Sequence, residues 1–447
     1  MLLPAPALLT CRVVRRVALR CRGASGGVSA ADKELRLAQH QLATAAAVLA
    51  ALAPAVRSDP NLPSRVRELA GERRYNSSSR RLYRELAFTA VRHWGWLEPL
   101  LQDAESCSLC TAWLADDTPE VRRLRASGAL DSLPPRASSL EEARLVLQAF
   151  TQNQQQLCPA SELALPGWLQ TSCAPPPAEL ALSRSPLYIR AAHPEAVAAD
   201  LLALGASLHA TVLPGCWEVR SEGVVDVTAA PSFAAGCFEV QDAGSQALLA
   251  AVAPSAGGRW LDACAGAGGK SLQLASLLGA SGHVDAEDVR DSALKQLQIR
   301  AQRAGLADRI ATSRTGQSKG RLYDGVLVDA PCTGSGTWRR APHLRWQLTP
   351  GAVSQAAQTQ LSILHANAAR VRPGGLLVYA TCSLARQENE AVVDAFLGAH
   401  STAHCFQPAE LPGAQALGLP AAHGRLALSS QMLNTDAFFV ASLRRTR

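Results

Sequence analysis

Three short apolar runs in the second half of the chain each end in polar or glycine-rich residues, and they constrain the fold more than any other feature. The three ends are Asp329–Cys332 (DAPC), Thr381–Ser383 (TCS) and Leu261–Lys270 (LDACAGAGGK). Short apolar runs bounded by turn residues are typical of buried strands. Because ligands bind at the carboxyl ends of strands in open α/β sheets, the sequence predicts a small-molecule cleft with thiols beside it.

From about residue 240 onward, predicted strands and helices alternate. Strands are predicted at Arg259–Ala263, His283–Asp288, Arg309–Ser313, Gly325–Asp329, Gly375–Thr381 and Ala437–Leu443. Helices are predicted at Ser271–Leu278, Asp291–Ala304, Val353–Ala369 and Glu388–Leu397. This alternation predicts an α/β fold with a doubly wound, mostly parallel sheet, in a domain of residues 241–447.

The first 240 residues divide into four segments of different composition. Residues 1–31 are apolar, arginine-rich and free of acids, which is typical of a transit peptide. We therefore expect a location in the mitochondrion or chloroplast, with the cytoplasm as the alternative. Residues 33–160 carry apolar residues at helical spacing and are predicted to be all-helical. The Pro/Ala-rich residues 161–182 are predicted as a linker, and residues 183–240 as a small αβ module with strands at Leu187–Arg190, His209–Leu213 and Trp217–Arg220.

The net charge of +7 includes +5 from the arginines of residues 1–31, so a nucleic-acid surface must be a local patch. Two patches are candidates for RNA binding. One surrounds a predicted helix start and contains Arg73, Arg80 and Arg81; the other contains Trp338, Arg339, Arg340, Arg345 and Trp346. Arginine forks suit phosphate oxygens, and interleaved aromatic rings suit unstacked bases. The alternatives are a solvated helix face and a packed helix start.

Twelve cysteines are spread through the chain without a regular framework, which favours a reducing compartment. Cys107 and Cys110 form a CxxC pair, but neither a second pair nor nearby histidines accompany it, so we expect packing and no metal. The chain has no stretch of the ~20 uninterrupted apolar residues that a membrane helix requires, so no membrane association is expected.

The glycine turn after the first predicted strand suits a small ligand at a helix N-terminus. Gly266, Gly268 and Gly269 let the backbone approach a ligand closely, yet neither GxGxxG nor a Walker pattern is present. Asp288 ends the next predicted strand, where an acid binds ribose hydroxyls. Ribose recognition without a pyrophosphate signature indicates S-adenosylmethionine, while a plain tight turn and a solvated acid remain the alternatives.

The two cysteines at strand ends suit chemistry at a ring carbon. A thiolate that adds to C6 of cytosine makes C5 able to attack a sulfonium methyl group. Asp329 is placed by sequence to hydrogen-bond N3 of the base, and a second cysteine can remove the C5 proton and release the first. A target base in folded RNA has to be extruded. The alternative for either cysteine alone is a buried, small apolar residue.

These motifs resemble those of the Sun/RsmB family of RNA 5-methylcytosine methyltransferases. Val326–Thr337 and Tyr379–Ser383 are similar to its two cysteine motifs, Leu261–Lys270 to its cofactor motif, Gly236–Gln246 to the preceding segment, and Glu72–Leu97 to its NusB-like RNA-binding domain. The resemblance implies a nucleophile at Cys382, a release cysteine at Cys332, an acid that serves catalysis and cofactor binding at Asp329, a ribose acid at Asp288, and a cofactor loop of Cys264, Ala265, Gly266, Ala267, Gly268, Gly269 and Lys270.

The chain departs from the family pattern mainly after the third predicted strand. The family carries an acid near the adenine there, and Ile310–Gly320 has none. The function expected is nevertheless S-adenosylmethionine-dependent methylation of cytosine C5 in RNA, and the expected RNA is small-subunit rRNA. We expect a monomer without an obligate protein partner. The alternative is a catalytically weak RNA-binding factor for ribosome assembly that keeps the fold. A DNA methyltransferase is disfavoured, because those enzymes use a single cysteine after the proline.

Overall fold

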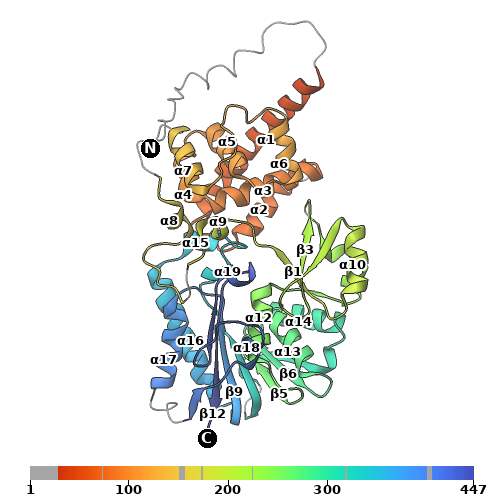
Figure 1. The fold of residues 1–447 in the computed structure, drawn as a ribbon, viewed down its shortest axis with the longest axis vertical. Coiled ribbons are helices and arrows are strands. Elements are labelled where there is room, and N and C mark those ends of the chain that lie inside the picture. Colours follow the sequence, from red (N-terminus) through yellow and green to blue (C-terminus); the bar gives the residue numbers. More distant parts are fainter. Residues whose placement is uncertain are drawn as a thin grey trace. The chain divides into compact units, whose positions relative to one another are not determined.

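The computed structural model describes residues 29–72, 74–150, 157–172, 175–223, 225–317, 320–399 and 405–447. Most of the predicted transit segment and Arg73 therefore lie outside the described residues. The chain divides into two compact units (Figure 1). One comprises Met1–Ala55 and Asn61–Pro159, and the other comprises Val56–Pro60 and Ala160–Arg447.

The first unit is helical in its described part. Its helices are α1 (Ala30–Leu52), α2 (Leu62–Ala70), α3 (Ser77–Arg92), α4 (Trp94–Leu97), α5 (Ala104–Leu114), α6 (Pro119–Ala126) and α7 (Leu140–Phe150). The apolar faces of α1, α2, α3, α5 and α6 meet in one core that includes Leu42, Leu86 and Val121. Cys107 and Cys110 lie buried on α5, and burial raises the pKa of Cys107 to about 11. The structure thus places the CxxC pair in the interior of the helical unit.

The described part of the stretch predicted as a linker is packed against the second unit. It contains two short helices, α8 (Ala160–Ala164) and α9 (Ala178–Ala181). Between them, Leu169 joins an apolar cluster with Trp338, Val353 and Ala385. Four described residues of this stretch, Leu163, Ala164, Leu169 and Leu182, are therefore buried, whereas α9 has no buried residue.

A small antiparallel sheet follows, with strand order β2-β3-β1-β4. Its elements are β1 (Leu187–Arg190), α10 (Pro194–Ala203), β2 (Ala206–Ala210), β3 (Cys216–Ser221), α11 (Pro231–Ala234) and β4 (Glu239–Val240). β2 begins and ends earlier than the predicted strand, because Thr211 starts a turn in which its hydroxyl accepts a hydrogen bond from the Leu213 amide at 3.1 Å. The Tyr188 hydroxyl donates to the Leu433 carbonyl at 3.2 Å and so ties this sheet to the main domain.

The main sheet has the strand order β10-β12-β9-β8-β5-β6-β7, with β11 paired to β12. Its strands are β5 (Arg259–Asp262), β6 (His283–Asp288), β7 (Ile310–Arg314), β8 (Tyr323–Asp329), β9 (Val371–Thr381), β10 (Phe406–Pro408), β11 (Arg425–Leu428) and β12 (Phe438–Arg445). β5 to β9 pair in parallel, whereas β12 is antiparallel to β9, β10 and β11. The predicted α/β fold with a mostly parallel sheet is confirmed.

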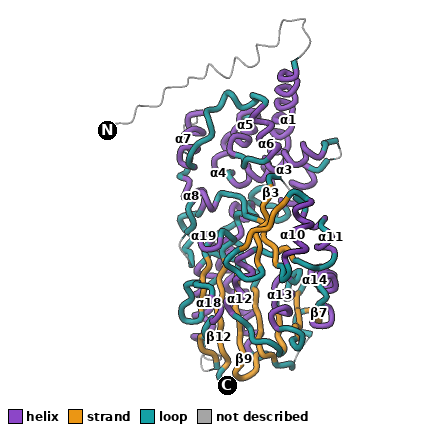
Figure 2. The backbone as a smooth tube through the Cα atoms, turned by 45° about the vertical axis from the view of Figure 1, so that its right-hand side comes forward, coloured by secondary structure: helices purple, strands orange, loops and turns teal. Residues whose placement is uncertain are grey.

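Helices cover both faces of this sheet (Figures 1 and 2). α12 (Ala243–Val252), α13 (Gly269–Leu278), α14 (Asp291–Arg303) and α18 (Pro412–Ala416) pack on one face, and α16 (Pro350–Ala368) and α17 (Glu390–Gly398) pack on the other. Two further short helices are α15 (His343–Gln347) and α19 (Ser430–Leu433). Among the residues that the structure describes, no helix has the length and hydrophobicity to cross a membrane.

Successive strand residues enter two different cores, as the period of two along a strand requires. On β8, Leu327 packs with α12, α13 and α14, while Val326 and Val328 pack with α16 and α17. On β9, Val378 belongs to the first core and Tyr379 to the second. Both faces are apolar, so strands that read as continuous hydrophobic runs lie in the centre of the sheet.

Candidate active site

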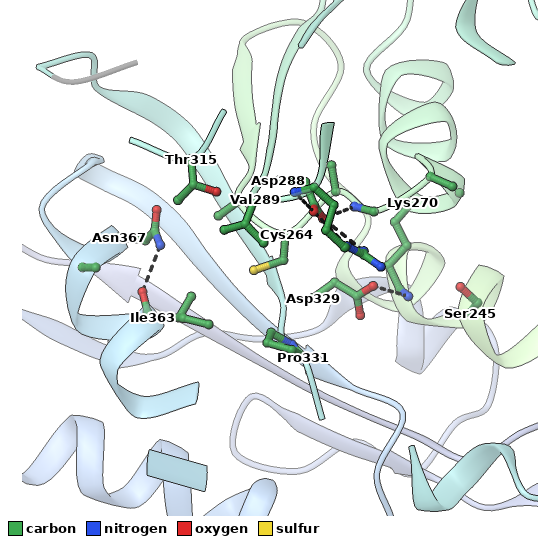
Figure 3. A pocket seen from close by; sticks show the side chains of 17 residues that line it. Ser245, Cys264, Lys270, Asp288, Val289, Thr315, Asp329, Pro331, Ile363 and Asn367 are labelled. Atoms are coloured by element: carbon green, nitrogen blue, oxygen red, sulfur yellow. Dashed lines mark hydrogen bonds and ion pairs between the residues drawn. The ribbon is translucent and has the colours of Figure 1, made fainter. Parts of the chain in front are cut away.

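The glycine turn lies where the strand order reverses. β5 is followed in sequence by β6 on one side, while β8 pairs with its other side, and ligands bind at such switch points. A cavity of about 620 Å³ opens there (Figure 3). Its lining includes the turn residues Cys264–Ala267, Gly269 and Lys270, with Asp288, Thr315, Asp329 and Asn367.

The turn needs glycine at position 268. Its φ is +87°, and a Cβ at this position would lie 2.1 Å from Cδ1 of Leu297 on α14. The left-handed backbone and the close helix thus both exclude a larger side chain. α13 begins directly after this residue, so its free N–H groups face the cavity end of the turn.

Asp288 lies at the end of β6 and faces the turn. Its carboxylate accepts a hydrogen bond from the Gly266 amide at 2.8 Å and three bonds from Arg290, through the amide, Nε and Nη2. Burial opposes the charge, but the bonds from Arg290 and Gly266 prevail and hold the pKa of Asp288 below its usual range. The group is therefore an ionised acceptor, and it lines the cavity as the sequence predicts.

Lys270 and Asp329 form an ion pair at another part of the cavity, with Nζ and Oδ2 2.8 Å apart (Figure 3). Burial disfavours the ammonium, yet the charge of Asp329 and its hydrogen bond outweigh burial and raise the pKa of Lys270. Nζ also lies 5.4 Å from the ring centre of Phe438 on β12. The pair joins the start of α13 to the end of β8.

The two predicted cysteines meet at the ends of adjacent strands. The Sγ atoms of Cys332 and Cys382 are 3.4 Å apart, and both side chains are half-buried. Gly336 brings their loops together: its amide donates to the Cys382 carbonyl at 2.9 Å, and a Cβ there would lie 2.8 Å from that oxygen. Both thiols are thus accessible in part and close enough to exchange a proton.

The surroundings make the two thiols unequal. The hydrogen bond from Cys332 lowers the pKa of Cys382; burial and Asp329 oppose this, while the cations Lys270 and Arg340 add to it. The same bond, burial and the negative charges of Cys382 and Glu388 raise the pKa of Cys332. Cys382 is therefore the more acidic thiol of the pair.

The predicted RNA-binding patch after the first cysteine is largely wrong. Arg339 is only 5% exposed, and its guanidinium donates to Ser183 Oγ and the Arg184 carbonyl. Trp338 is also buried and packs in the apolar cluster that contains Leu169. Arg345 is buried as well, and its guanidinium donates to the Glu162 carbonyl. These side chains pack because residues 160–184 cover them. Of the patch, Arg340 is exposed, and it pairs with Asp436 at 2.7 Å.

The arginine patch of the helical unit is exposed in its described part. Arg80 lies on the surface in the first turn of α3. Arg81 is 41% exposed and pairs with Glu120 on α6 at 2.7 Å. The RNA contact predicted for these residues stays a prediction.

Asp262, at the end of β5, is a buried acid that the sequence did not mark as a site residue. Oδ2 accepts a bond from Ser271 at 2.6 Å, while Oδ1 has no partner among the described residues. Burial and the nearby charge of Asp329, only partly offset by Ser271, raise its pKa to about 7. This carboxyl therefore keeps its proton to a higher pH than an exposed aspartate does.

The Asp262 pKa predicts a pH dependence of stability. The folded state holds a proton that the unfolded chain releases near pH ~4, so the free energy of unfolding falls as pH rises toward about 7. Asp262→Asn removes this effect. We expect the loss of thermal stability between about pH 5 and pH 8 to be smaller in the variant than in the wild type, as measured by calorimetry without ligand.

Asp285→Asn is the matched control for this experiment. Asp285 is buried at the far end of the neighbouring strand, and its pKa is lowered by bonds from Arg259, Arg321 and Tyr323 against the effect of burial. It is ionised in both states above about pH 5, so its replacement should leave the pH dependence unchanged. Equal curves for Asp262→Asn and wild type would contradict the prediction.

Two other cavity residues, Thr315 and Asn367, were not predicted from the sequence. Asn367 lies at the end of α16, and its Nδ2 donates to the Ile363 carbonyl at 2.9 Å (Figure 3). Thr315 follows β7, where the expected acid is absent. The sequence around a polar residue near a helix end does not indicate that the residue lines a cavity.

Comparisons with known proteins agree with this geometry. The sequence model of the family described as 16S rRNA methyltransferase RsmB/F matches residues 249–444. The probable ribosomal RNA small subunit methyltransferase B of Synechocystis sp. is 34% identical over 224 residues, 49% of this chain and 50% of that protein. The ribosomal RNA small subunit methyltransferase F of Serratia proteamaculans is 32% identical over 243 residues, 52% of this chain and 50% of that protein.

A solved structure extends the likeness of the fold. The crystal structure of PH0851 matches with a TM-score of 0.64 at 22% identity, covering 90% of this chain and 99% of that one. The strand order, the glycine turn and the cavity at the switch point define a methyltransferase domain with a Rossmann-like fold. Residues 249–444 are therefore similar to the RsmB/F family. It spans about half the length of the curated relatives it matches.

Proposed function

We propose that this chain transfers a methyl group from S-adenosylmethionine to C5 of a cytosine in small-subunit rRNA, through a covalent protein–RNA adduct. The observation that carries the proposal is the 3.4 Å separation of the Cys332 and Cys382 Sγ atoms at adjacent strand ends. A single reactive thiol would suit many reactions, but two thiols of unequal pKa suit addition and release at one base. The names of the relatives, rRNA small subunit methyltransferases, support the substrate class.

The cavity residues fit the methyl donor. Asp288 offers an ionised carboxylate for ribose hydroxyls, and the turn at Gly266–Gly269 brings bare backbone to the cavity. Thr315 and Asn367 supply neutral polar groups in place of the family's acid near the adenine. When bound, the donor supplies an electrophilic methyl on its sulfonium.

The remaining chemistry belongs to the chain's own side chains. The Cys382 thiolate adds to C6 of the base, and its electron pair displaces the C5–C6 π bond toward C5 and N3. Asp329 is assigned to N3: its carboxyl group delivers a proton to N3 as negative charge develops there, and takes the proton back after C5 is methylated. The Lys270 ammonium, which donates to Asp329 Oδ2 at 2.8 Å, stabilises the carboxylate in between. Once C5 carries the methyl group, Cys332 releases its own proton to solvent, and the resulting thiolate takes the C5 proton. The C5–C6 double bond then re-forms, and the C6–Sγ bond breaks to regenerate the Cys382 thiolate.

RNA contacts are proposed at exposed arginines near the thiols and on the helical unit. Arg340 is 57% exposed and contributes to the low pKa of Cys382, so a phosphate of the target strand would meet a cation there. Arg80 and Arg81 are the described candidates on α3. We propose a monomer that acts in an organelle, following the composition of residues 1–31.

The direct test is a transfer assay with purified protein, small-subunit rRNA and methyl-labelled S-adenosylmethionine. We expect 5-methylcytosine in the digested RNA, and bisulfite sequencing then identifies the position. Cys237→Ala, at an exposed cysteine outside the site, should match the wild type. Label on a ring nitrogen or an exocyclic amine would refute the C5 assignment. RNA binding without any transfer would favour the alternative, a ribosome-assembly factor whose cofactor site lost its acid after β7.

A further inference from the structure

Glu388 is a buried carboxylate that the mechanism above leaves unused. It ends the short 3₁₀ turn Arg386–Glu388, six residues after Cys382, and its side chain is fully buried. Four hydrogen bonds reach it, all from neutral groups. None of the ion pairs found among the described residues involves it. A buried charge without a counter-ion is costly to maintain, so its retention calls for a physical explanation.

The bonds of Glu388 come from the residues that directly follow the two cysteines. Thr333, next to Cys332, donates its amide to Oε2 at 2.9 Å and its hydroxyl to Oε1. Ser383, next to Cys382, donates its hydroxyl to Oε1 at 2.6 Å. One carboxylate therefore holds both strand ends.

Gln360 fixes the carboxylate from the other side. This fully buried residue of α16 donates Nε2 to Glu388 Oε2 at 2.9 Å and to the Pro331 carbonyl at 3.0 Å. The loop before Cys332 is thus tied to the same group. A carboxylate offers four lone-pair positions on two acceptors, which suits a convergence of donors that an amide cannot satisfy.

We propose that Glu388 is a positioning residue that sets the separation and alignment of the Cys332 and Cys382 thiols. Its catalytic consequence rests on the proposed function, but its geometric consequence does not. The negative charge of Glu388 also contributes to the raised pKa of Cys332, and so favours Cys332 as the donor of the pair.

The geometric consequence is testable without RNA or methyl donor. Diamide, a diazene oxidant, accepts two electrons and two protons from a pair of thiols, which become a disulfide while the diazene becomes a hydrazine. Sulfurs 3.4 Å apart need only a small movement to reach the ~2.05 Å of a disulfide. The rate at which Cys332 and Cys382 couple, followed by peptide mass spectrometry, therefore reports their alignment.

Glu388→Gln keeps the shape of the side chain but replaces one acceptor by a donor. We expect the Cys332–Cys382 disulfide to form about tenfold more slowly in this variant. The loops that carry the two cysteines are held less firmly, so their Sγ atoms spend less time close together. Asp285→Asn removes an equally buried carboxylate from the other end of the sheet and should couple at the wild-type rate. Wild-type coupling in a folded Glu388→Gln variant would overturn the proposal.

A second variant keeps the test valid if Glu388→Gln does not fold. Thr333→Val retains the carboxylate and removes one hydroxyl donor, and we expect coupling to slow by about threefold. Unchanged coupling in this variant would likewise overturn the proposal. In the transfer assay, kcat of Glu388→Gln should fall by about 10- to 100-fold, while KM for the methyl donor stays constant, since Glu388 does not line the donor cavity. If disulfide coupling is slow in Glu388→Gln but the wild type transfers no methyl group, the positioning role is supported and only the proposed function is rejected.

Discussion

Replacing Cys382 by alanine is expected to reduce methyl transfer by at least about 10³-fold, because the thiolate that activates C5 is removed outright. No neighbour can substitute for it directly: Cys332 lies 3.4 Å away, and its pKa is raised where that of Cys382 is lowered. Binding of S-adenosylhomocysteine should change little, since Cys382 does not line the donor cavity. The measurement is single-turnover transfer of labelled methyl to small-subunit rRNA, together with calorimetric titration of the donor product.

Cys237→Ala provides the matched control for this variant. Cys237 is an exposed free thiol in the small αβ module, so its loss tests for general effects of removing a cysteine. Near-normal transfer by Cys382→Ala would contradict the nucleophile assignment. Loss of donor binding together with loss of transfer would point to misfolding of the strand end.

Replacing Cys332 by alanine is expected to trap the RNA on the protein. The C5 proton then has no acceptor within reach, so the double bond does not re-form and the C6–Sγ bond persists. The adduct should resist denaturation and migrate slowly in a denaturing gel, with methyl label in the same band. Formation should also be slower than in the wild type, since the bond from Cys332 is the largest effect that lowers the pKa of Cys382.

The double variant Cys332→Ala/Cys382→Ala separates a covalent bond from tight binding. It should form no adduct, because the bond requires the Cys382 sulfur. An adduct that survives in the double variant, or is absent from Cys332→Ala while product still forms, would assign proton removal to another group.

The sequence predicted the parts of the fold that follow from short-range physics. Apolar runs of one strand's length located β8 and β9, since a strand buried on both faces must be apolar throughout. β6 contains three acids and β7 is partly exposed, and the alternation of strands and helices located them. β10 and β11 were not predicted, because three- and four-residue strands are defined by their partners rather than by their own pattern. The observed strand lies earlier in the chain than the predicted strand at residues 209–213, because Thr211 begins a turn. A local hydrogen bond to its hydroxyl stabilises this turn, and the spacing of apolar residues does not reveal such a bond.

The site shows the same division. Cys332, Cys382 and Lys270 lie shortly after the ends of three predicted strands, so the sequence was sufficient to predict that they are close to one another. Glu388 could not be recognised, since an acid inside a helix-like segment reads as a solvated residue until its long-range partners are known. Arg339 failed for the opposite reason: an arginine in a polar loop reads as exposed, and burial by residues 183–184 depends on tertiary packing.

The position of β12 has a consequence for biosynthesis. This strand is translated after all other strands of the sheet, yet it lies between β9 and β10 and also pairs with β11. Until it emerges from the ribosome, the nascent chain presents β9 as a bare edge and leaves two short strands without a template. Phe438 and Asp436, which contact Lys270 and Arg340, arrive at the same late moment. The surroundings of the Cys382 thiol, to which Lys270 and Arg340 contribute, are thus completed only after β12 has joined the sheet.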